Sequence, residues 1–111
     1  MKNVLTPITL INAGSMAGNL TSAAIDTTFL DDMGVHFIWT GSPTGTLAVN
    51  ASNDNVNFFA LTFNPAITQP AGSASNTGAA IITFPWKWIQ VSYTASTGSG
   101  SLTALLTGKA I

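Results

Sequence analysis

Short runs in which hydrophobic and polar residues alternate recur along the whole chain, and turn-forming residues separate them. The alternation is clearest at 46–52, where Leu47 and Val49 share one phase and Ala48 and Asn50 the other. A period of two places such sets on opposite faces of a β-strand. The pattern predicts strands at 3–11, 20–25, 33–40, 46–52, 58–63, 79–84, 86–94 and 101–107.

Regular turn signals around short β-rich runs are typical of a sandwich or barrel. We therefore expect an all-β protein, an antiparallel, jelly-roll-like β-sandwich of about eight strands in which residues 1–111 form a single domain. Helix competes only weakly, at 20–33 and at 102–106. Strand phase predicts a core that includes Val35, Phe37, Trp39, Leu47, Val49, Ile89, Val91 and Tyr93.

Two connections are predicted to be hairpins. Residues 40–45, Thr-Gly-Ser-Pro-Thr-Gly, join two well-patterned strands and supply glycine for positive φ and proline for a fixed φ. Residues 94–100 join the strand at 86–94 to the last strand, again with glycine at the tip. Strands joined in this way are antiparallel. The segment 64–78, which contains Pro, Gly, Ser and Asn, is predicted to be a long surface loop that is functional or mobile.

Charge is scarce over the whole chain. Only 6% of the 111 residues are charged and the net charge is −1, whereas about a quarter of an ordinary soluble domain is charged. Weak self-repulsion and a surface that is cheap to desolvate favour assembly with neighbours, the alternative being a neutral, threonine-rich secreted domain. Three scattered Lys and no Arg cannot form the clustered cationic surface that nucleic acid requires.

The absence of Cys removes disulfides, zinc ribbons and thiol nucleophiles, and it leaves the redox compartment undetermined. The first residues carry one positive charge but no continuous apolar segment like that of a signal peptide. No apolar run reaches the roughly 18 residues of a membrane-spanning helix. We expect synthesis in a cytoplasm and use without cleavage.

Candidate catalytic residues are few. His36, the single histidine, lies mid-strand in the phase opposite Val35 and Phe37, and no Gly-x-Ser-x-Gly elbow occurs, so we expect a sheet-face residue. The adjacent pair Asp31 and Asp32 is expected to be a charged turn before the strand at 33–40. Binding of Ca²⁺ by this pair together with loop carbonyls stays open as an alternative.

Residues 53–55, Asn-Asp-Asn, faintly echo a calcium loop but lack its Gly and terminal Glu, so an Asx-rich turn is expected. No Walker loop, dinucleotide-binding fingerprint or His/Cys cluster occurs. We therefore predict that the chain is not an enzyme and has no cofactor and no metal site.

The aromatic residues near 86–90 are more informative. Trp86, Trp88 and Gln90 have the phase opposite Ile89 and Val91, so two indoles lie outside the core if the latter pair faces it. Exposed aromatic residues with polar neighbours mark a subunit interface or a sugar platform. We predict an interface formed by Trp86, Trp88 and Gln90. The alternatives are that Trp86 covers the open end of the sandwich and that the indoles bind a sugar.

Two stretches carry a resemblance to a known family. In 37–54 a strand ends in Trp-Thr-Gly, a glycine turn follows, and the next strand ends in Ser-Asn-Asp. In 88–109 a final hairpin closes on Gly-Lys. Together they resemble small β-sandwich structural proteins of bacteriophage virions, and the resemblance covers about 19–109. It implies a virion component, either a capsid protein, a decoration protein or a fibre or spike base, and supplies no catalytic residues.

The chain departs from that family at Gln90, where similar proteins often carry Arg, and at Phe58, where they often carry Trp. The first departure puts in doubt any contact that the arginine would make. The fold is also loosely similar to discoidin-like carbohydrate-binding modules, which supports an alternative function as a glycan-binding module of a host-recognition device.

The expected location is the virion, and the expected partners are other virion proteins and copies of the chain itself. We expect a homo-oligomer, such as a trimer or a pentamer, because few strand positions carry the Lys or Pro that keep sheet edges apart. The segment 3–11 is apolar enough to pair with a neighbour's edge as well as with its own sheet. No membrane span and no nucleic-acid partner are predicted.

Overall fold

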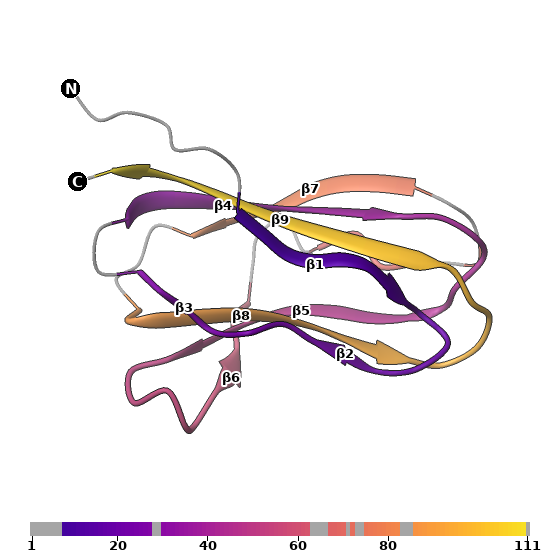
Figure 1. Cartoon of the computed structure of the whole chain (residues 1–111), viewed down its shortest axis with the longest axis horizontal. Coiled ribbons are helices and arrows are strands. Elements are labelled where there is room, and N and C mark those ends of the chain that lie inside the picture. The colour runs from indigo at the N-terminus through magenta and orange to yellow at the C-terminus, as the bar shows by residue number, and fades with distance from the viewer. Residues whose placement is uncertain are drawn as a thin grey trace.

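Two antiparallel β-sheets face each other in the computed structural model, which describes residues 8–27, 30–62, 67–70, 72, 75–82 and 86–110 (Figure 1). The strands of the described residues are β1 (Ile8–Ser15), β2 (Leu20–Thr21), β3 (Ile25–Asp26), β4 (Leu30–Trp39), β5 (Gly45–Ser52), β6 (Phe59–Ala60), β7 (Ser75–Ile82), β8 (Trp88–Ala95) and β9 (Ser101–Ala110). One sheet, called the β4–β9 sheet, has the order β1-β9-β4-β7. The other, called the β5–β8 sheet, has the order β2-β8-β5-β6, and β3 also pairs with β8.

The expectation of an all-β, antiparallel sandwich is confirmed. The strand expected at 20–25 is divided into β2 and β3, both on the same edge of β8. Between them Ser22 N–H donates to Val91 O at 2.9 Å, but the second bond of the pair goes to the side chain, because Val91 N–H donates to Ser22 Oγ at 3.0 Å. In the described part of the chain, no helix is long and apolar enough to cross a membrane.

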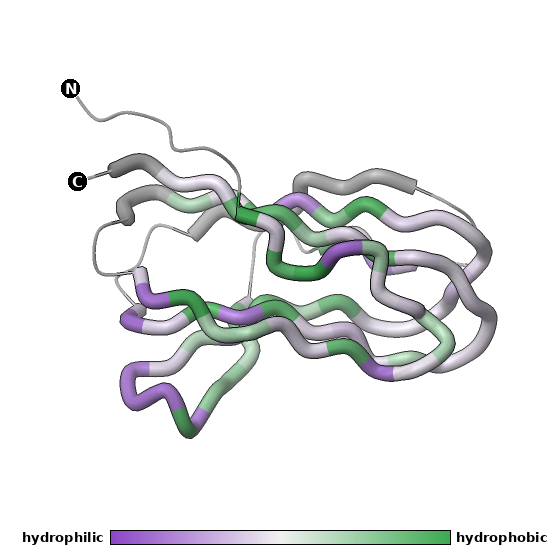
Figure 2. Tube along the Cα trace, in the orientation of Figure 1, coloured by the Kyte–Doolittle hydropathy of each residue, from purple (hydrophilic) through white to green (hydrophobic). Residues whose placement is uncertain are grey.

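The core lies between the sheets and is built from the strand phases. All eight core residues predicted from the sequence are buried, each at most 3% exposed. In Figure 2, hydrophobic stretches recur along strands of both sheets. The remaining buried hydrophobic side chains of the core cluster are Ile11, Met16, Met33, Ala51, Ile67, Leu102, Ala104 and Leu106.

The two predicted hairpins are wrong, because each connection crosses from one sheet to the other. Residues 40–44 join β4 to β5, and residues 96–100 join β8 to β9, yet neither pair of strands shares a sheet. The two crossings instead run antiparallel to each other and carry the β4–β9 ladder into the β5–β8 ladder. Their backbone hydrogen bonds are Thr40 N to Ser101 O, Ser42 N to Ser99 O, and Thr44 N to Thr97 O, at 3.0, 3.0 and 2.7 Å.

Glycine is what allows the two crossings to approach so closely. Gly98 has a φ of 76°, and a Cβ placed there would collide with the carbonyl oxygen of Ser42. Gly41, on the facing crossing, has a φ of 80°, and its Cβ would collide with the carbonyl oxygen of Ser99. The glycines with positive φ expected of these segments are present, but they allow two paired segments to bend together from one sheet to the other and do not form hairpins.

Several boundaries also differ from expectation. The first strand, expected to end at residue 11, continues to Ser15 in β1, where Ala13 has a φ of 52° and the pairing with β9 is twice irregular. A bulge absorbs the extra residue without ending the strand. The loop expected at 64–78 is too long, because β7 begins at Ser75. Residues 3–7 of the strand expected at 3–11, and 83–84 at the end of the strand expected at 79–84, lie outside the described residues.

Candidate functional site

The outer face of the β5–β8 sheet is formed by the residues that alternate with the buried core positions. On β8 these are Trp88, Gln90, Ser92 and Thr94, and on β5 they are Thr46, Ala48 and Asn50. Across the two strands they pair directly, Asn50 with Gln90, Ala48 with Ser92, and Thr46 with Thr94. None of these seven side chains is charged, so this face can be desolvated without burying an ion.

A diagonal hydrogen bond ties the two strands together on this face. Asn50 Nδ2 donates to Ser92 Oγ at 3.1 Å, which leaves the amide of Gln90 beside it on the same surface. Gln90 is half-buried. Amides and hydroxyls arranged in this way can exchange water for hydrogen bonds with an incoming polar surface.

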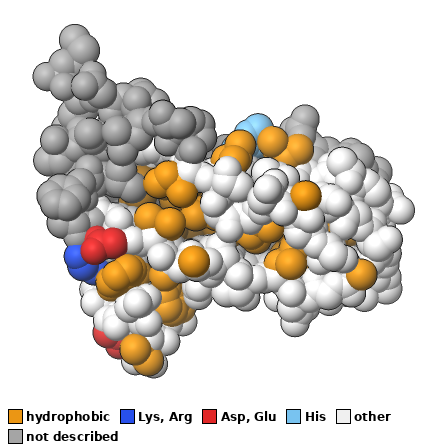
Figure 3. Space-filling view, in the orientation of Figure 1, with side chains coloured by type: hydrophobic (Ala, Val, Ile, Leu, Met, Phe, Trp, Pro, Cys, Tyr) orange, Lys and Arg blue, Asp and Glu red, His pale blue; other side chains and the backbone are white. Residues whose placement is uncertain are grey.

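Trp88 lies at the end of this face, half-buried, beside an ion pair. Lys87 Nζ lies 5.7 Å from the centroid of the Trp88 ring, a distance compatible with a cation–π interaction. The same ammonium contacts both carboxylate oxygens of Asp26 at 3.0 Å. Because both charged side chains are more than 40% exposed, the pair contributes at most about 1 kcal/mol. In the view of Figure 3, charged side chains gather at one end of the molecule and most of the described surface is uncharged.

Trp86 is placed differently from Trp88. It precedes β8, is half-buried, and packs against the core cluster. Its ring meets that of Phe59 edge to face, with centroids 4.9 Å apart and an interplanar angle of 78°. Thr27 Oγ1 donates to the Trp86 carbonyl oxygen, which ties this segment to the residues after β3. Of the predicted trio, Trp88 and Gln90 thus share the outer face, and Trp86 packs against the core cluster.

The other candidate residues are dispersed. His36 is exposed in the middle of β4, opposite Leu105 of β9, which confirms its expected place on a sheet face. The charged turn expected at 31–32 is wrong, because β4 begins at Leu30 and the backbone of Asp31 lies opposite that of Lys109 in the β4–β9 ladder. The Asp31 and Asp32 side chains lie outside the described residues. Across the described part of the chain, no group of three or more His, Cys, Asp or Glu side chains could hold a metal ion.

The Asx-rich turn expected at 53–55 is confirmed. The Asp54 carboxylate accepts hydrogen bonds from the backbone N–H groups of Asn57 and Val56, at 2.8 and 2.9 Å, and from the hydroxyl of Ser52 at 2.8 Å. These bonds hold the pKa of the Asp54 carboxyl well below its ordinary range, the Asn57 N–H being the largest cause. Asn55 has a φ of 59°, as such turns require. The Asp54 carboxylate therefore stabilises the turn by hydrogen bonding.

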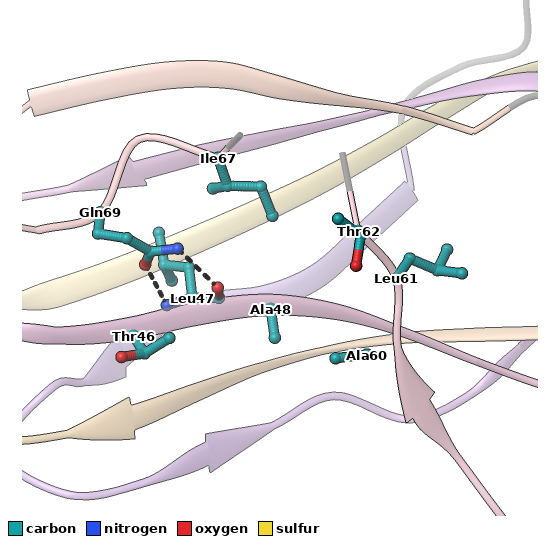
Figure 4. Close-up of a pocket in the computed structure, with 8 residues that line it drawn as sticks. All are labelled: Thr46, Leu47, Ala48, Ala60, Leu61, Thr62, Ile67 and Gln69. Atoms are coloured by element: carbon teal, nitrogen blue, oxygen red, sulfur yellow. Dashed lines mark hydrogen bonds between the residues drawn. The ribbon is translucent and has the colours of Figure 1, made fainter. Parts of the chain in front are cut away.

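Sequence reasoning missed a pocket at the edge of β5 (Figure 4). Its volume is about 270 Å³, and its lining comes from β5, β6 and the segments that follow β6. At its rim the side chain of Gln69 bonds both backbone groups of Leu47: Leu47 N–H donates to Gln69 Oε1 at 2.5 Å, and Gln69 Nε2 donates to Leu47 O at 3.0 Å. One signal was present in the sequence, since a residue before proline, here Pro70, favours an extended backbone.

Comparisons with known proteins give a likeness of fold. No protein-family model matches the chain, and no curated protein sequence does. A chain in the structure of infectious bursal disease virus, Gx strain, superimposes with a TM-score of 0.54 at 15% sequence identity. The superposition covers 98% of the present chain and 32% of the viral one, so the present chain spans about a third of that chain's length.

Proposed function

We propose that the chain is a structural component of a bacteriophage virion, a capsid, decoration or spike-base subunit that acts by self-assembly and by binding other virion proteins. The observation that carries this proposal is the fold likeness to a chain of a virus structure, which extends over 98% of the present chain. The assignment to a bacteriophage comes from the sequence resemblance at 37–54 and 88–109.

The strand order supports the proposal. From β4 onward the long strands β4, β5, β7, β8 and β9 alternate between the sheets, and we interpret the orders β1-β9-β4-β7 and β2-β8-β5-β6 as those of a double-sheet jelly roll. Jelly rolls recur in viral capsid proteins. A fold alone does not assign a function, so the remaining support must come from a surface suited to assembly.

The uncharged outer face of the β5–β8 sheet is such a surface. Burying it removes no ion from water, and its amides and hydroxyls can hydrogen bond across an interface. Trp88 is the natural anchor, because large aromatic side chains dominate interface energies. Trp86, which packs on the core, would support this end of the interface from beneath. We propose a homo-oligomer, a trimer or a pentamer, in which Trp88 and Gln90 contact a neighbouring copy.

The test is the substitution Trp88→Asp, followed by light scattering and sedimentation at micromolar concentration. The wild type is expected to be a defined oligomer and the variant a folded monomer, because truncating an interface Trp costs about 2 kcal/mol or more. His36→Asp places a new carboxylate on an exposed position of the other sheet and is expected to leave the oligomer intact. A wild-type monomer that also fails to bind particles would refute the proposal.

A second candidate is glycan binding. The observation that favours it is a half-buried indole, Trp88, with the amides of Gln90 and Asn50 on the same face, since sugar sites combine an aromatic ring with polar groups. A glycan array separates the two functions: micromolar binding that is lost in Trp88→Ala supports this candidate over assembly. No enzymatic activity is proposed, since nothing in the described site supplies a nucleophile beside a base.

A further inference from the structure

Among the residues that the structure describes, only part of the β5 edge has a neighbouring strand. β6 pairs with Asn50 and Ala51, and one further bond joins Leu61 N–H to Val49 O at 2.8 Å. Beyond that point the next residue whose backbone faces this edge is Leu47. There the carboxamide of Gln69 takes the position that a strand backbone would occupy.

The Gln69 carboxamide reproduces what a strand residue would present. A primary amide offers one carbonyl oxygen and one N–H to the same partner, as a residue in an antiparallel hydrogen-bonded pair does. In Figure 4 its two dashed bonds run side by side to the N–H and C=O of Leu47. A side chain therefore completes the ladder at the position where a further strand would.

The pocket adjoins this position, and its lining indicates which kind of side chain such a strand would place there. It is lined by side chains that carry no charge, Thr46, Leu47, Ala48, Ala60, Leu61, Thr62, Ile67 and Gln69. Its 270 Å³ is large enough for an aliphatic side chain, and most of its wall is aliphatic. A charged side chain would lose its hydration there without gaining a counter-ion.

We propose that the β5 edge is an acceptor site for an extended, uncharged peptide segment of a partner protein. The incoming backbone displaces the Gln69 carboxamide, pairs with Leu47, and places one aliphatic side chain in the pocket. This is strand addition to a sheet edge, in which main-chain bonds give affinity and the pocket gives specificity. The site goes beyond the proposed assembly function and does not depend on the Trp88 face.

The exchange requires little movement of the protein. The two bonds that Gln69 gives up are replaced by two from the peptide, so the hydrogen-bond count at Leu47 is unchanged. The flanking chain stays in place, because Ile67 and Pro70 are buried and Gly72 N–H donates to Pro43 O at 2.9 Å. Gln69 itself is exposed, so its side chain can swing into solvent.

The probe is a capped heptapeptide of alternating Thr and Val, titrated into ¹⁵N-labelled protein while the Leu47 amide is followed by NMR. Saturable shifts of Leu47 and of the Gln69 side-chain amide are expected. Gln69→Met keeps the length of the side chain but removes the competing bonds, and we expect it to tighten binding about tenfold. Ala60→Leu narrows the pocket and is expected to weaken binding about tenfold.

Two controls separate pairing from adhesion. The same peptide with every backbone nitrogen methylated cannot donate to Leu47 O and is expected not to bind. His36→Asn, on the outer face of the other sheet, is expected to bind like the wild type. Hydrogen exchange of the Leu47 amide gives a readout that needs only the wild type, if Gln69→Met does not fold: added peptide is expected to slow that exchange at least tenfold.

The proposal is overturned if Leu47 is unaffected by the peptide, or if the methylated peptide binds as well as the parent. It is also overturned if Gln69→Met is folded and binds no more tightly. Shifts of Leu47 that follow protein concentration in the absence of peptide would assign the edge to a second copy of the chain instead. Trp88→Asp is expected to bind the peptide normally, so failure of the assembly function and failure of this site can be told apart.

Discussion

Replacing Gly98 with alanine tests the close approach of the two crossings between the sheets. Gly98 has a φ of 76°, a region that costs an L-residue about 1–2 kcal/mol. The added methyl group would also overlap the Ser42 carbonyl oxygen and lie 3.2 Å from the Pro43 Cα. Both are backbone atoms, so relief requires the crossings to separate, which weakens the bond from Ser42 N–H to Ser99 O.

Losing one backbone hydrogen bond costs about 1 kcal/mol, so together with the backbone strain we expect Gly98→Ala to lower the free energy of unfolding by about 3 kcal/mol. Stiffening of the unfolded chain by alanine returns about 0.4–1 kcal/mol of this. The remainder is a large share of the roughly 5–15 kcal/mol that stabilises a typical domain. Urea unfolding followed by tryptophan fluorescence measures the loss as a shift of the midpoint at constant m-value.

Gly18→Ala is the matched control, because nothing lies within 4 Å of a Cβ built at Gly18. Its stability should stay within about 0.5 kcal/mol of the wild type. Gly98→Asn separates strain from overlap, since asparagine tolerates positive φ yet carries the same Cβ. We expect it to recover part of the strain but to keep the cost of the overlap, so its stability should lie between those of the wild type and Gly98→Ala. If Gly98→Ala and Gly18→Ala had equal midpoints, the account of the paired crossings would be refuted.

Three further substitutions test local interactions. Tyr93→Phe removes the hydrogen bond that the buried hydroxyl donates to Thr44 O at 2.7 Å and should lower the free energy of unfolding by about 1 kcal/mol in urea. Because burial raises the pKa of Tyr93, the wild type should lose stability as the pH rises above 10, and the variant should lose less. An equal loss in both proteins at alkaline pH would contradict this. Ser22→Ala leaves the Val91 N–H without the hydroxyl that accepts its hydrogen bond and should cost about 1–3 kcal/mol, whereas a neutral result would mean that another group accepts that bond. Asp54→Asn should reduce stability at pH 6 more than at pH 2. The pKa of the Asp54 carboxyl is lowered in the folded state, so its charge adds stability that is present above the ordinary carboxyl pKa of 3.8 and is lost as the pH falls. Equal losses at both pH values would show that the charge of Asp54 does not matter.

The phase of hydrophobic residues is enough to predict the core. Val35, Phe37 and Trp39 alternate with His36 and Ile38, and burial follows the same alternation. A slip of one residue would turn every side chain to the other face, so phase and burial are tightly coupled wherever one face of a strand is covered. The same coupling makes the outward position of Trp88 predictable from the amino-acid sequence.

Sheet membership was not predictable in the same way. Residues 40–45 have the composition of a hairpin turn, yet they connect two sheets. Glycine and proline report the local backbone conformation, and that conformation is shared by tight turns and by crossings. What decides between them is pairing with a distant segment: 30–52 is aligned with 88–110 along its whole length, and no local pattern encodes that alignment.

The pocket escaped prediction because side chains there replace backbone. Gln69 completes the ladder of β5, and Ser22 completes that of β8, in stretches where no strand is formed. Strand propensities indicate which residues form strands, but they do not indicate which side chains make the hydrogen bonds of a strand backbone. Only the neighbouring Pro70 favoured an extended backbone at Gln69.

These two substitutions for backbone pairing change how the β5–β8 sheet can meet other chains. Growth of the sheet at the β5 edge requires that the Gln69 side chain first leave. At the β8 edge Ser22 bonds Val91 through its backbone N–H as well as its hydroxyl, at 2.9 and 3.0 Å, and Ser22 is buried whereas Gln69 is exposed. The β5 edge is therefore the more accessible of the two. The outer face needs no such exchange, because it carries no charge and Trp88, the anchor we propose for it, is already half-buried. Association through the face is then limited by desolvation, and association through the edge by the exchange at Leu47, so substitutions at Trp88 and at Gln69 should act independently.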